Sequence, residues 1–194
     1  METLIKTLKS SLNVYNMIDI YNEELVRECV GEVKDKLILN PPIIVYDKPA
    51  IQHRSIGFFS NTSIGYRYSN QIAKSIALTP KLEILLKLIN DKFNSEFNGI
   101  LVNKYIDGND YIGAHSDDEK NLDSIGVVAI SYGAVRKFRI RDKKTRKIVK
   151  DIPTLSNHII HMAGNFQKEF IHEIPIEKKV KEERYSFTFR KHLK

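Results

Sequence analysis

Hydrophobic and polar positions follow a helical period in the first half of the chain. Between about residues 22 and 37, apolar residues recur three and four positions apart, which predicts a helix that ends before Pro41 and Pro42. A second helix is predicted to begin at Thr79 and Pro80, residue types that suit the N-cap and the first turn. Its apolar stripe is expected to pack in the core and consists of Leu82, Leu85, Leu86, Ile89, Phe93 and Phe97.

After Gly99 the hydrophobic period changes to two. Short segments rich in β-branched and aromatic residues are separated by glycine, asparagine, aspartate or proline, and each predicts a strand. These segments are 99–106, 124–133, 135–141, 155–162, 169–175 and 184–190. Helices followed by many short strands are typical of an α+β domain, and strands this short fit a jelly-roll double sheet better than a parallel sheet.

Composition places these elements in one globular domain. The chain has 194 residues, of which 42% are hydrophobic and 28% charged, and no repeat or Gly/Ser linker divides it. One cysteine, Cys29, excludes a disulfide framework and a multi-cysteine zinc site, and no stretch approaches membrane-spanning length. We therefore expect an intracellular protein without a membrane partner, and we take it to be a monomer by default. The formal net charge of +7 permits an anionic partner such as nucleic acid.

Candidate chemistry begins at His115-Ser116-Asp117. In an extended segment, side chains two positions apart point to the same face, so an imidazole and a carboxylate would converge there. Two such ligands, a more distant histidine and open positions make a mononuclear non-haem Fe(II) site, although a polar surface turn would show the same residues. For the third ligand we prefer His172, in an apolar segment that can form a neighbouring strand, over His161. The residues alone leave both open.

The last predicted strand carries polar side chains on one face. Alternation places Tyr185, Phe187 and Phe189 together, and the opposite face carries Arg184, Ser186, Thr188 and Arg190. Because the planar fork of arginine grips a carboxylate through two hydrogen bonds, two arginines on one face would suit a dicarboxylate. An ordinary solvent-facing surface is the alternative. Asn103 and Tyr105 share a face of an earlier strand and can also bond a carboxylate or keto oxygen, unless Tyr105 is simply a buried tyrosine with a satisfied hydroxyl.

Four blocks of residues, in this order, resemble one family. They read N-x-Y-x-D-G-x-D-x-I-G-x-H-x-D-D-E from Asn103, S-Y-G-A-x-R-x-F from Ser131, M-x-G-N-x-Q-x-x-x-x-H-x-I-P from Met162, and R-x-S-x-T-F-R from Arg184. The chain is similar to the AlkB-type Fe(II)/2-oxoglutarate-dependent dioxygenases that dealkylate nucleic acids. Within that family it most resembles the branch that repairs duplex DNA. The resemblance extends from about Pro42 to His192.

The resemblance implies a double-stranded β-helix (jelly-roll) core and a set of site residues. The metal ligands, which are also the catalytic residues, would be His115, Asp117 and His172. The 2-oxoglutarate contacts would be Asn103, Tyr105, Arg184, Ser186 and Arg190. Among these, Arg184 would pair with the distal carboxylate and Arg190 would lie near the metal-side carboxylate. The family usually has asparagine at the position of Ser186.

The resemblance also implies how a substrate would be recognised. A base must leave the helical stack to reach a buried metal, and the family covers it with a nucleotide-recognition lid. Contacts to the extruded nucleotide would come from Arg54, Tyr66, Tyr68 and Glu119, although alternating aromatic residues are also ordinary strand residues. Val45-Tyr46-Asp47 falls where duplex-repair members carry a hydrophobic finger. The basic run 142–147 is either a hairpin tip that contacts phosphates or a solvated turn.

We therefore expect one domain over 1–194, with a helical extension (about 1–41), the lid (42–78), a supporting helix (79–98) and the jelly-roll core (99–192). The expected function is oxidative demethylation of N-alkylated bases in DNA, which repairs alkylation damage. It would use Fe(II), 2-oxoglutarate and O2, and release formaldehyde, succinate and CO2. The alternatives are an RNA demethylase with the same core and a non-catalytic basic nucleic-acid-binding module. A hydrolytic metal site would leave the arginine face unexplained.

Overall fold

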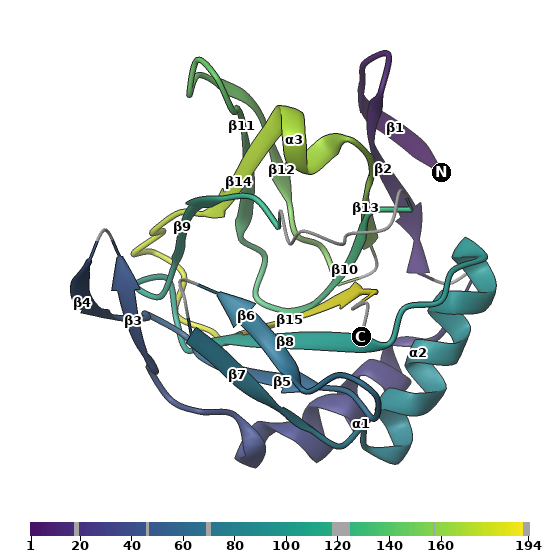
Figure 1. Ribbon diagram of the computed structural model, residues 1–194. Coiled ribbons are helices and arrows are strands. Elements are labelled where there is room, and N and C mark those ends of the chain that lie inside the picture. Colours follow the sequence, from purple (N-terminus) through teal and green to yellow (C-terminus); the bar gives the residue numbers. More distant parts are fainter. Residues whose placement is uncertain (18–19, 46, 69–70, 118–124, 157, 192–194) are drawn as a thin grey trace.

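Two β-sheets form the core of the protein, and two helices cover the outer face of the larger sheet (Figure 1). The computed structural model describes residues 1–17, 20–45, 47–68, 71–117, 125–156 and 158–191. The arrangement is the jelly-roll that the strand pattern predicts. No helix within these residues is long and apolar enough to cross a membrane.

Within the described chain, the larger sheet has nine strands. Their spatial order is β1 (Glu2–Lys6), β2 (Ser10–Asn16), β13 (His158–Gly164), β10 (Val127–Gly133), β15 (Arg184–Arg190), β8 (Gly99–Tyr105), β5 (Ser55–Phe59), β7 (Gln71–Ile76) and β6 (Gly65–Tyr68). The smaller sheet has the order β12 (Ile148–Pro153), β11 (Lys137–Asp142), β14 (Phe170–Ile174) and β9 (Ile112–His115). A separate hairpin joins β3 (Pro42–Val45) to β4 (Lys48–Ile51). The helical segments are α1 (Glu23–Val33), η2 (Lys34–Lys36), α2 (Pro80–Phe93) and α3 (Phe166–Glu169).

Hydrophobic side chains pack on both faces of the larger sheet. On the outer face, buried residues of α1 and α2 pack against alternate residues of β8, β10 and β15. On the inner face, a second cluster combines residues of the larger sheet, such as Val127 and Met162, with Phe138 and Ile140 of the smaller sheet. The sheets are therefore held together by a shared apolar layer, and the polar site described below lies in the same interior.

Both predicted helices are present, and local capping explains where they start and stop. α1 begins where the side chain of Asn22 accepts a hydrogen bond from the N–H of Leu25. α2 begins in the same way at Thr79 and ends at Asn94, which adopts the left-handed conformation with φ of 46°. α2 therefore stops before Phe97, which is buried beyond its end.

Residues 2–16 correct the expectation of a helical extension over 1–41. They form β1 and β2, and the predicted helix begins only after them. β2 pairs with β13 in an unbroken antiparallel register from Ser10↔Gly164 to Asn16↔His158. Because this partner lies far along the chain, the local pattern of the first residues does not reveal the pairing.

All six strands predicted after Gly99 are present, as β8, β10, β11, β13, β14 and β15. β9 corresponds to the extended segment expected at His115, and β12 has no counterpart among the predicted strands. The segment expected as a lid, 42–78, also contributes to the core. Its β5 pairs with β8 in the larger sheet, and all five residues of β5 are buried.

Candidate metal centre

β15 places polar side chains in the interior of the protein. All seven of its residues are buried, and its aromatic face packs with α1 and α2. The opposite face, with Arg184, Ser186, Thr188 and Arg190, is therefore turned toward the smaller sheet. An ordinary solvent-facing surface, the alternative that the sequence left open, is wrong.

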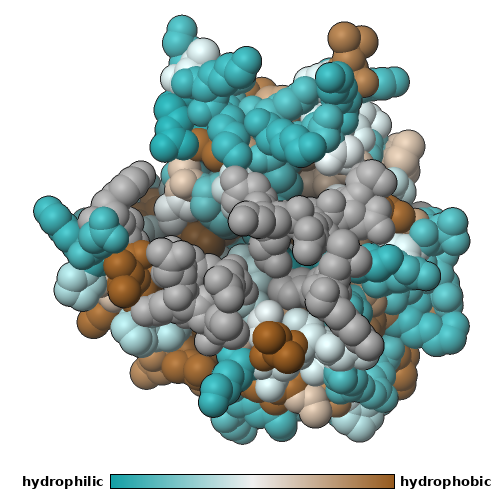
Figure 2. Space-filling model, in the orientation of Figure 1, coloured by the Kyte–Doolittle hydropathy of each residue, from teal (hydrophilic) through white to brown (hydrophobic). Residues whose placement is uncertain are grey.

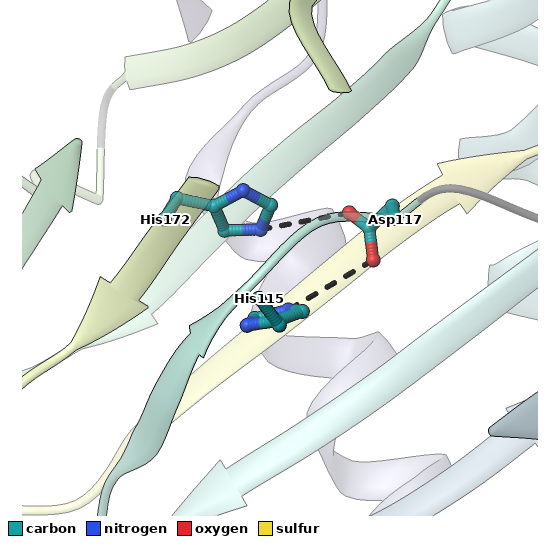
Figure 3. Close-up of side chains that lie close together, drawn as sticks. All are labelled: His115, Asp117 and His172. Carbon is teal, nitrogen blue, oxygen red and sulfur yellow. Dashed lines mark ion pairs between the residues drawn. The ribbon is translucent and has the colours of Figure 1, made fainter. Parts of the chain in front are cut away.

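Three potential metal ligands meet beside this face (Figure 3). Nε2 of His115 lies 3.9 Å from Oδ1 of Asp117, and Nε2 of His172 lies 3.6 Å from Oδ2. One ligand atom from each residue lies within 4.8 Å of the others. The pairing of β9 with β14 places His115 directly opposite His172, and Asp117 follows two residues after the end of β9. The structure thus brings together the three residues proposed from the sequence.

The His115 imidazole is poised to coordinate through Nε2. Nδ1 of His115 lies 2.8 Å from the main-chain oxygen of Gly113. Since a carbonyl oxygen only accepts, Nδ1 carries the proton and Nε2 keeps its lone pair. Burial lowers the pKa of His115. Burial, with the neighbouring His115 and Arg190, lowers the pKa of His172 to about 3, so both rings are neutral near pH 7, as a metal ligand must be.

Asp117 supplies the negative charge of the cluster. Burial alone would raise the pKa of its carboxyl group. The positive charge of Arg190, with smaller effects of the neighbouring His172 and His115, outweighs burial and lowers that pKa to about 2. Nη2 of Arg190 also donates a hydrogen bond to Oδ1 at 3.3 Å. Two neutral imidazoles and one carboxylate form the donor set typical of a mononuclear non-haem Fe(II) site, so these residues fit that ion.

Arg184 lies at the other end of the same face with its bonding incomplete. The residue is 3% exposed. Its Nε donates to Oγ1 of Thr154 at 3.2 Å, and its Nη2 donates to Oγ of Ser131 at 2.8 Å. Nη1 is buried and has no hydrogen-bond partner among the described residues. Burial lowers the pKa of Arg184, because a buried charge without a counter-ion is costly. A bound carboxylate would supply both the charge and the missing acceptor.

The strand register brings the other proposed 2-oxoglutarate residues beside Arg184. On β8, Tyr105 lies opposite Arg184, and Asn103 lies opposite Ser186. The guanidinium carbon of Arg184 lies 5.2 Å from the centre of the Tyr105 ring. Ser131 and Thr154, which orient Arg184, were not singled out from the sequence. Ser131 begins one of the four motif blocks, but its contact with Arg184 depends on the pairing of β10 with β15.

The proposed substrate residues fall into two groups. Nε of Arg54 donates to Oδ1 of Asn103 at 2.9 Å, and the Tyr66 ring lies 4.6 Å from the guanidinium carbon of Arg190. Both residues therefore lie next to proposed cosubstrate residues. Tyr68 is the last residue of β6, and Glu119 lies outside the described residues, as does Tyr46 of the expected finger.

His161, the other candidate for the third ligand, has a structural role instead. Its Nε2 donates to the main-chain oxygen of Ile125 at 2.6 Å. Its ring packs against Phe93 of α2, with ring centres 4.8 Å apart, and near Tyr15. It therefore lies on the outer side of the larger sheet, away from the three-residue cluster.

Comparisons with known proteins agree with this geometry. The family model described as the 2OG-Fe(II) oxygenase superfamily matches residues 21–190. The DNA oxidative demethylase ALKBH2 of Homo sapiens is 29% identical over 179 residues, which cover 88% of this chain and 69% of that protein. ALKBH2 of Bos taurus is 30% identical over 181 residues, which cover 88% of this chain and 64% of that protein. The solved structure of OsALKBH1 has a TM-score of 0.65 at 15% identity, covers 96% of this chain and 100% of its own, and is a likeness of fold alone.

Proposed function

The chain belongs to the 2OG-Fe(II) oxygenase superfamily, and on this premise we propose that it removes alkyl groups oxidatively from nitrogen atoms of DNA bases. Membership makes it a dioxygenase that depends on Fe(II) and 2-oxoglutarate, and these with O2 supply its oxidising chemistry. Relatives named as DNA oxidative demethylases support DNA as the substrate. The proposed products are the dealkylated base, formaldehyde, succinate and CO2.

One observation supports this reaction most directly: the inner face of β15 connects an arginine with an open donor to the metal-ligand cluster. Arg190, at one end of the face, bonds to Asp117. Arg184, at the other end, keeps a buried Nη1 without a partner among the described residues. A diacid lying along this face would therefore place one carboxylate at Arg184 and the other beside the metal ligands. 2-Oxoglutarate has this pair of groups.

The side chains along the face have distinct proposed roles. Arg184 pairs with the distal carboxylate, and the Tyr105 ring covers one side of its guanidinium group. Asn103 and Ser186, opposite each other on β8 and β15, offer polar groups along the diacid. Arg190 neutralises the metal-side carboxylate while it holds Asp117 ionised. Together these groups would orient the cosubstrate before the reaction begins, and orientation is the protein's main contribution to such chemistry.

Residues of β6 and of the segment just before β5 would hold the extruded base. Tyr66 is half-buried and its ring lies beside Arg190, which bonds to Asp117, so a base at the metal would lie near this ring. Arg54 is half-buried and bonds to Asn103, which places a positive charge beside the cosubstrate pocket. We propose that these two residues, with Tyr68 and Glu119, line the substrate side of the site.

The hairpin between β11 and β12 supports a nucleic-acid partner. Its turn carries exposed Lys144, Arg146 and Lys147. The only acid of the run, Asp142, is turned inward to the main chain, where its Oδ1 accepts hydrogen bonds from the N–H groups of Lys144 and Thr145. Figure 2 shows hydrophilic side chains gathered over this hairpin. Exposed cations of this kind bind phosphates without regard to sequence.

The proposed function is tested by product release from methylated oligonucleotides. Single-stranded DNA, duplex DNA and RNA of one sequence, each with a methylated base nitrogen, are incubated with Fe(II), 2-oxoglutarate and ascorbate, and formaldehyde and succinate are measured. We expect equal amounts of both products from DNA. His172→Ala and Asp117→Ala should abolish release, because each removes a metal ligand.

His161→Leu is the matched control, since it removes a buried histidine outside the cluster and should retain activity in the folded protein. Release that survives in Asp117→Ala would contradict the metal assignment. Faster release from RNA than from either DNA would favour an RNA demethylase, and nucleic-acid binding without turnover of any substrate would favour a binding module.

A further inference from the structure

Asp117 is held by a side chain rather than by strand pairing. It lies two residues beyond the end of β9, and its buried main-chain N–H donates to Oε1 of Gln167 at 2.9 Å. The Gln167 side chain is buried, and its Nε2 donates to Sδ of Met162 at 3.4 Å. Because the amide nitrogen faces this sulfur, the amide oxygen is directed at Asp117. Gln167 thus satisfies a buried main-chain donor of a metal-ligand residue.

Gln167 also connects the two segments that carry the ligands. It lies in α3, and α3 leads directly into β14, the strand with His172. Its contact with Asp117 spans 50 positions of sequence. A single side chain therefore ties the segment with His115 and Asp117 to the segment with His172.

Lys143 forms a second bridge between the same segments. Its Nζ donates to Oγ of Ser116 at 2.8 Å and to the main-chain oxygen of Gln167 at 3.0 Å. Its own main-chain N–H donates to the oxygen of Glu169 at 2.9 Å, which anchors the lysine to the end of α3. Lys143 is half-buried, whereas the next residue, Lys144, is exposed. Within one basic run, one lysine therefore faces the ligand segment and its neighbour faces outward.

We propose that Gln167 and Lys143 are positioning residues that fix the separation of the metal ligands before an ion binds. The inference rests on the proposed function only in taking His115, Asp117 and His172 as the ligands. Neither residue supplies a ligand atom. Gln167 acts through the main-chain N–H of Asp117, and Lys143 acts through the side chain of Ser116. When such supporting contacts are lost, the ligands must be ordered by the ion itself, and metal affinity falls about 10–100-fold.

The test compares metal affinity in four variants. Mn(II) and Co(II) are titrated into the metal-free protein in competition with a chelating dye, and the midpoint of thermal unfolding is measured on the same samples. Gln167→Met keeps the size of the side chain but removes the acceptor. It should lower the affinity for both ions about 10–100-fold. Gln167→Glu keeps an acceptor and should restore most of the affinity. Lys143→Met should weaken binding about 3–10-fold, the value of a typical hydrogen bond, and Lys144→Met should leave it unchanged.

The Co(II) absorption spectrum supplies a readout that a purely structural role would not move. A changed spectrum in Gln167→Met, with the wild-type spectrum in Lys144→Met, supports positioning of the ligands. The inference is overturned if folded Gln167→Met and Lys143→Met bind both ions like the wild type, or if Lys144→Met is impaired as much as Lys143→Met. A wild-type protein that binds neither ion would instead contradict the proposed function, so the two failures are distinguishable.

Discussion

Two buried arginines lie close to the Tyr105 ring, and they differ in what their guanidinium groups contact. The guanidinium carbons lie 5.9 Å and 5.2 Å from the ring centre for Arg136 and Arg184. Arg136 pairs with Glu177 at 3.3 Å and donates to the main-chain oxygens of Asp107, Asp110 and Pro175. Arg184 donates to two hydroxyl groups, and its Nη1 has no partner in the described part of the chain.

This difference separates a structural cation from the one that we propose binds a ligand. Burying a charge costs several kcal/mol unless a counter-charge and hydrogen bonds offset it. Arg136 has both, and its bonds join the loop before β9 to the loop after β14. No described acid forms an ion pair with Arg184, and we propose that a bound carboxylate offsets that cost. Incomplete bonding of a buried charge is therefore the feature that marks the site.

The largest expected effect comes from removing the structural arginine. Arg136→Met should lower the free energy of unfolding by about 3–5 kcal/mol, because it leaves buried carbonyl oxygens and Glu177 without their donor. Urea denaturation of the metal-free protein measures this. The control is Arg139→Met, which removes a partly exposed ion pair with Asp151 and should cost less than about 1 kcal/mol. Equal losses in the two variants would remove the distinction drawn for Arg136.

Removing Arg184, the arginine proposed to bind 2-oxoglutarate, should affect ligand binding more than stability. Arg184→Met should change the free energy of unfolding by less than about 1 kcal/mol, because it also removes an uncompensated buried charge. It should weaken 2-oxoglutarate binding to the Mn(II)-loaded protein about 10–100-fold, the value of a hydrogen bond to a charged group. Calorimetry under nitrogen measures the affinity. Undiminished affinity in the folded variant would show that the carboxylate binds elsewhere. Arg184→Lys keeps the charge but not the planar fork, so its affinity for 2-oxoglutarate should lie between those of the wild type and Arg184→Met.

A smaller effect is expected from the group that orients Arg184. Ser131→Ala removes the acceptor for Nη2, so the guanidinium group loses one of the two contacts that direct Nη1 toward the cosubstrate. The affinity for 2-oxoglutarate should fall about 3–10-fold. Ser156→Ala is the control, since that hydroxyl bonds to the main chain of Gly133 near the surface and should leave the affinity unchanged. A larger loss in the control than in Ser131→Ala would count against an orienting role.

Sequence predicts the local parts of this site well. The alternation in 184–190 identifies both faces of β15, because the period of a strand is a local property. That both faces are buried depends on packing with α1, α2 and the smaller sheet, and the sequence left the environment of the polar face open. The same limit applies to His161 and His172. Both lie in apolar strands, and only the fold places one beside Ile125 and the other beside Asp117.

The parts that sequence reasoning missed depend on distant segments. β1 and β2 owe their strand conformation to β13, and Thr154 reaches Arg184 from the end of β12. Gln167 belongs to one of the four motif blocks, so the resemblance already marked its position. Its proposed role, however, depends on the packing of α3 against Asp117. Residue type and spacing thus predicted ligand chemistry, whereas the supporting contacts emerged only from the fold.

We propose that the histidine–aspartate cluster and Arg184 together form one site for a metal ion and a diacid. Anaerobic calorimetric titration of 2-oxoglutarate into the protein, with and without Fe(II), tests this most directly. We expect one molecule of 2-oxoglutarate per chain in the presence of Fe(II), and much weaker binding without it or in Asp117→Ala. Equal affinity with and without Fe(II), or in Asp117→Ala, would contradict the claim.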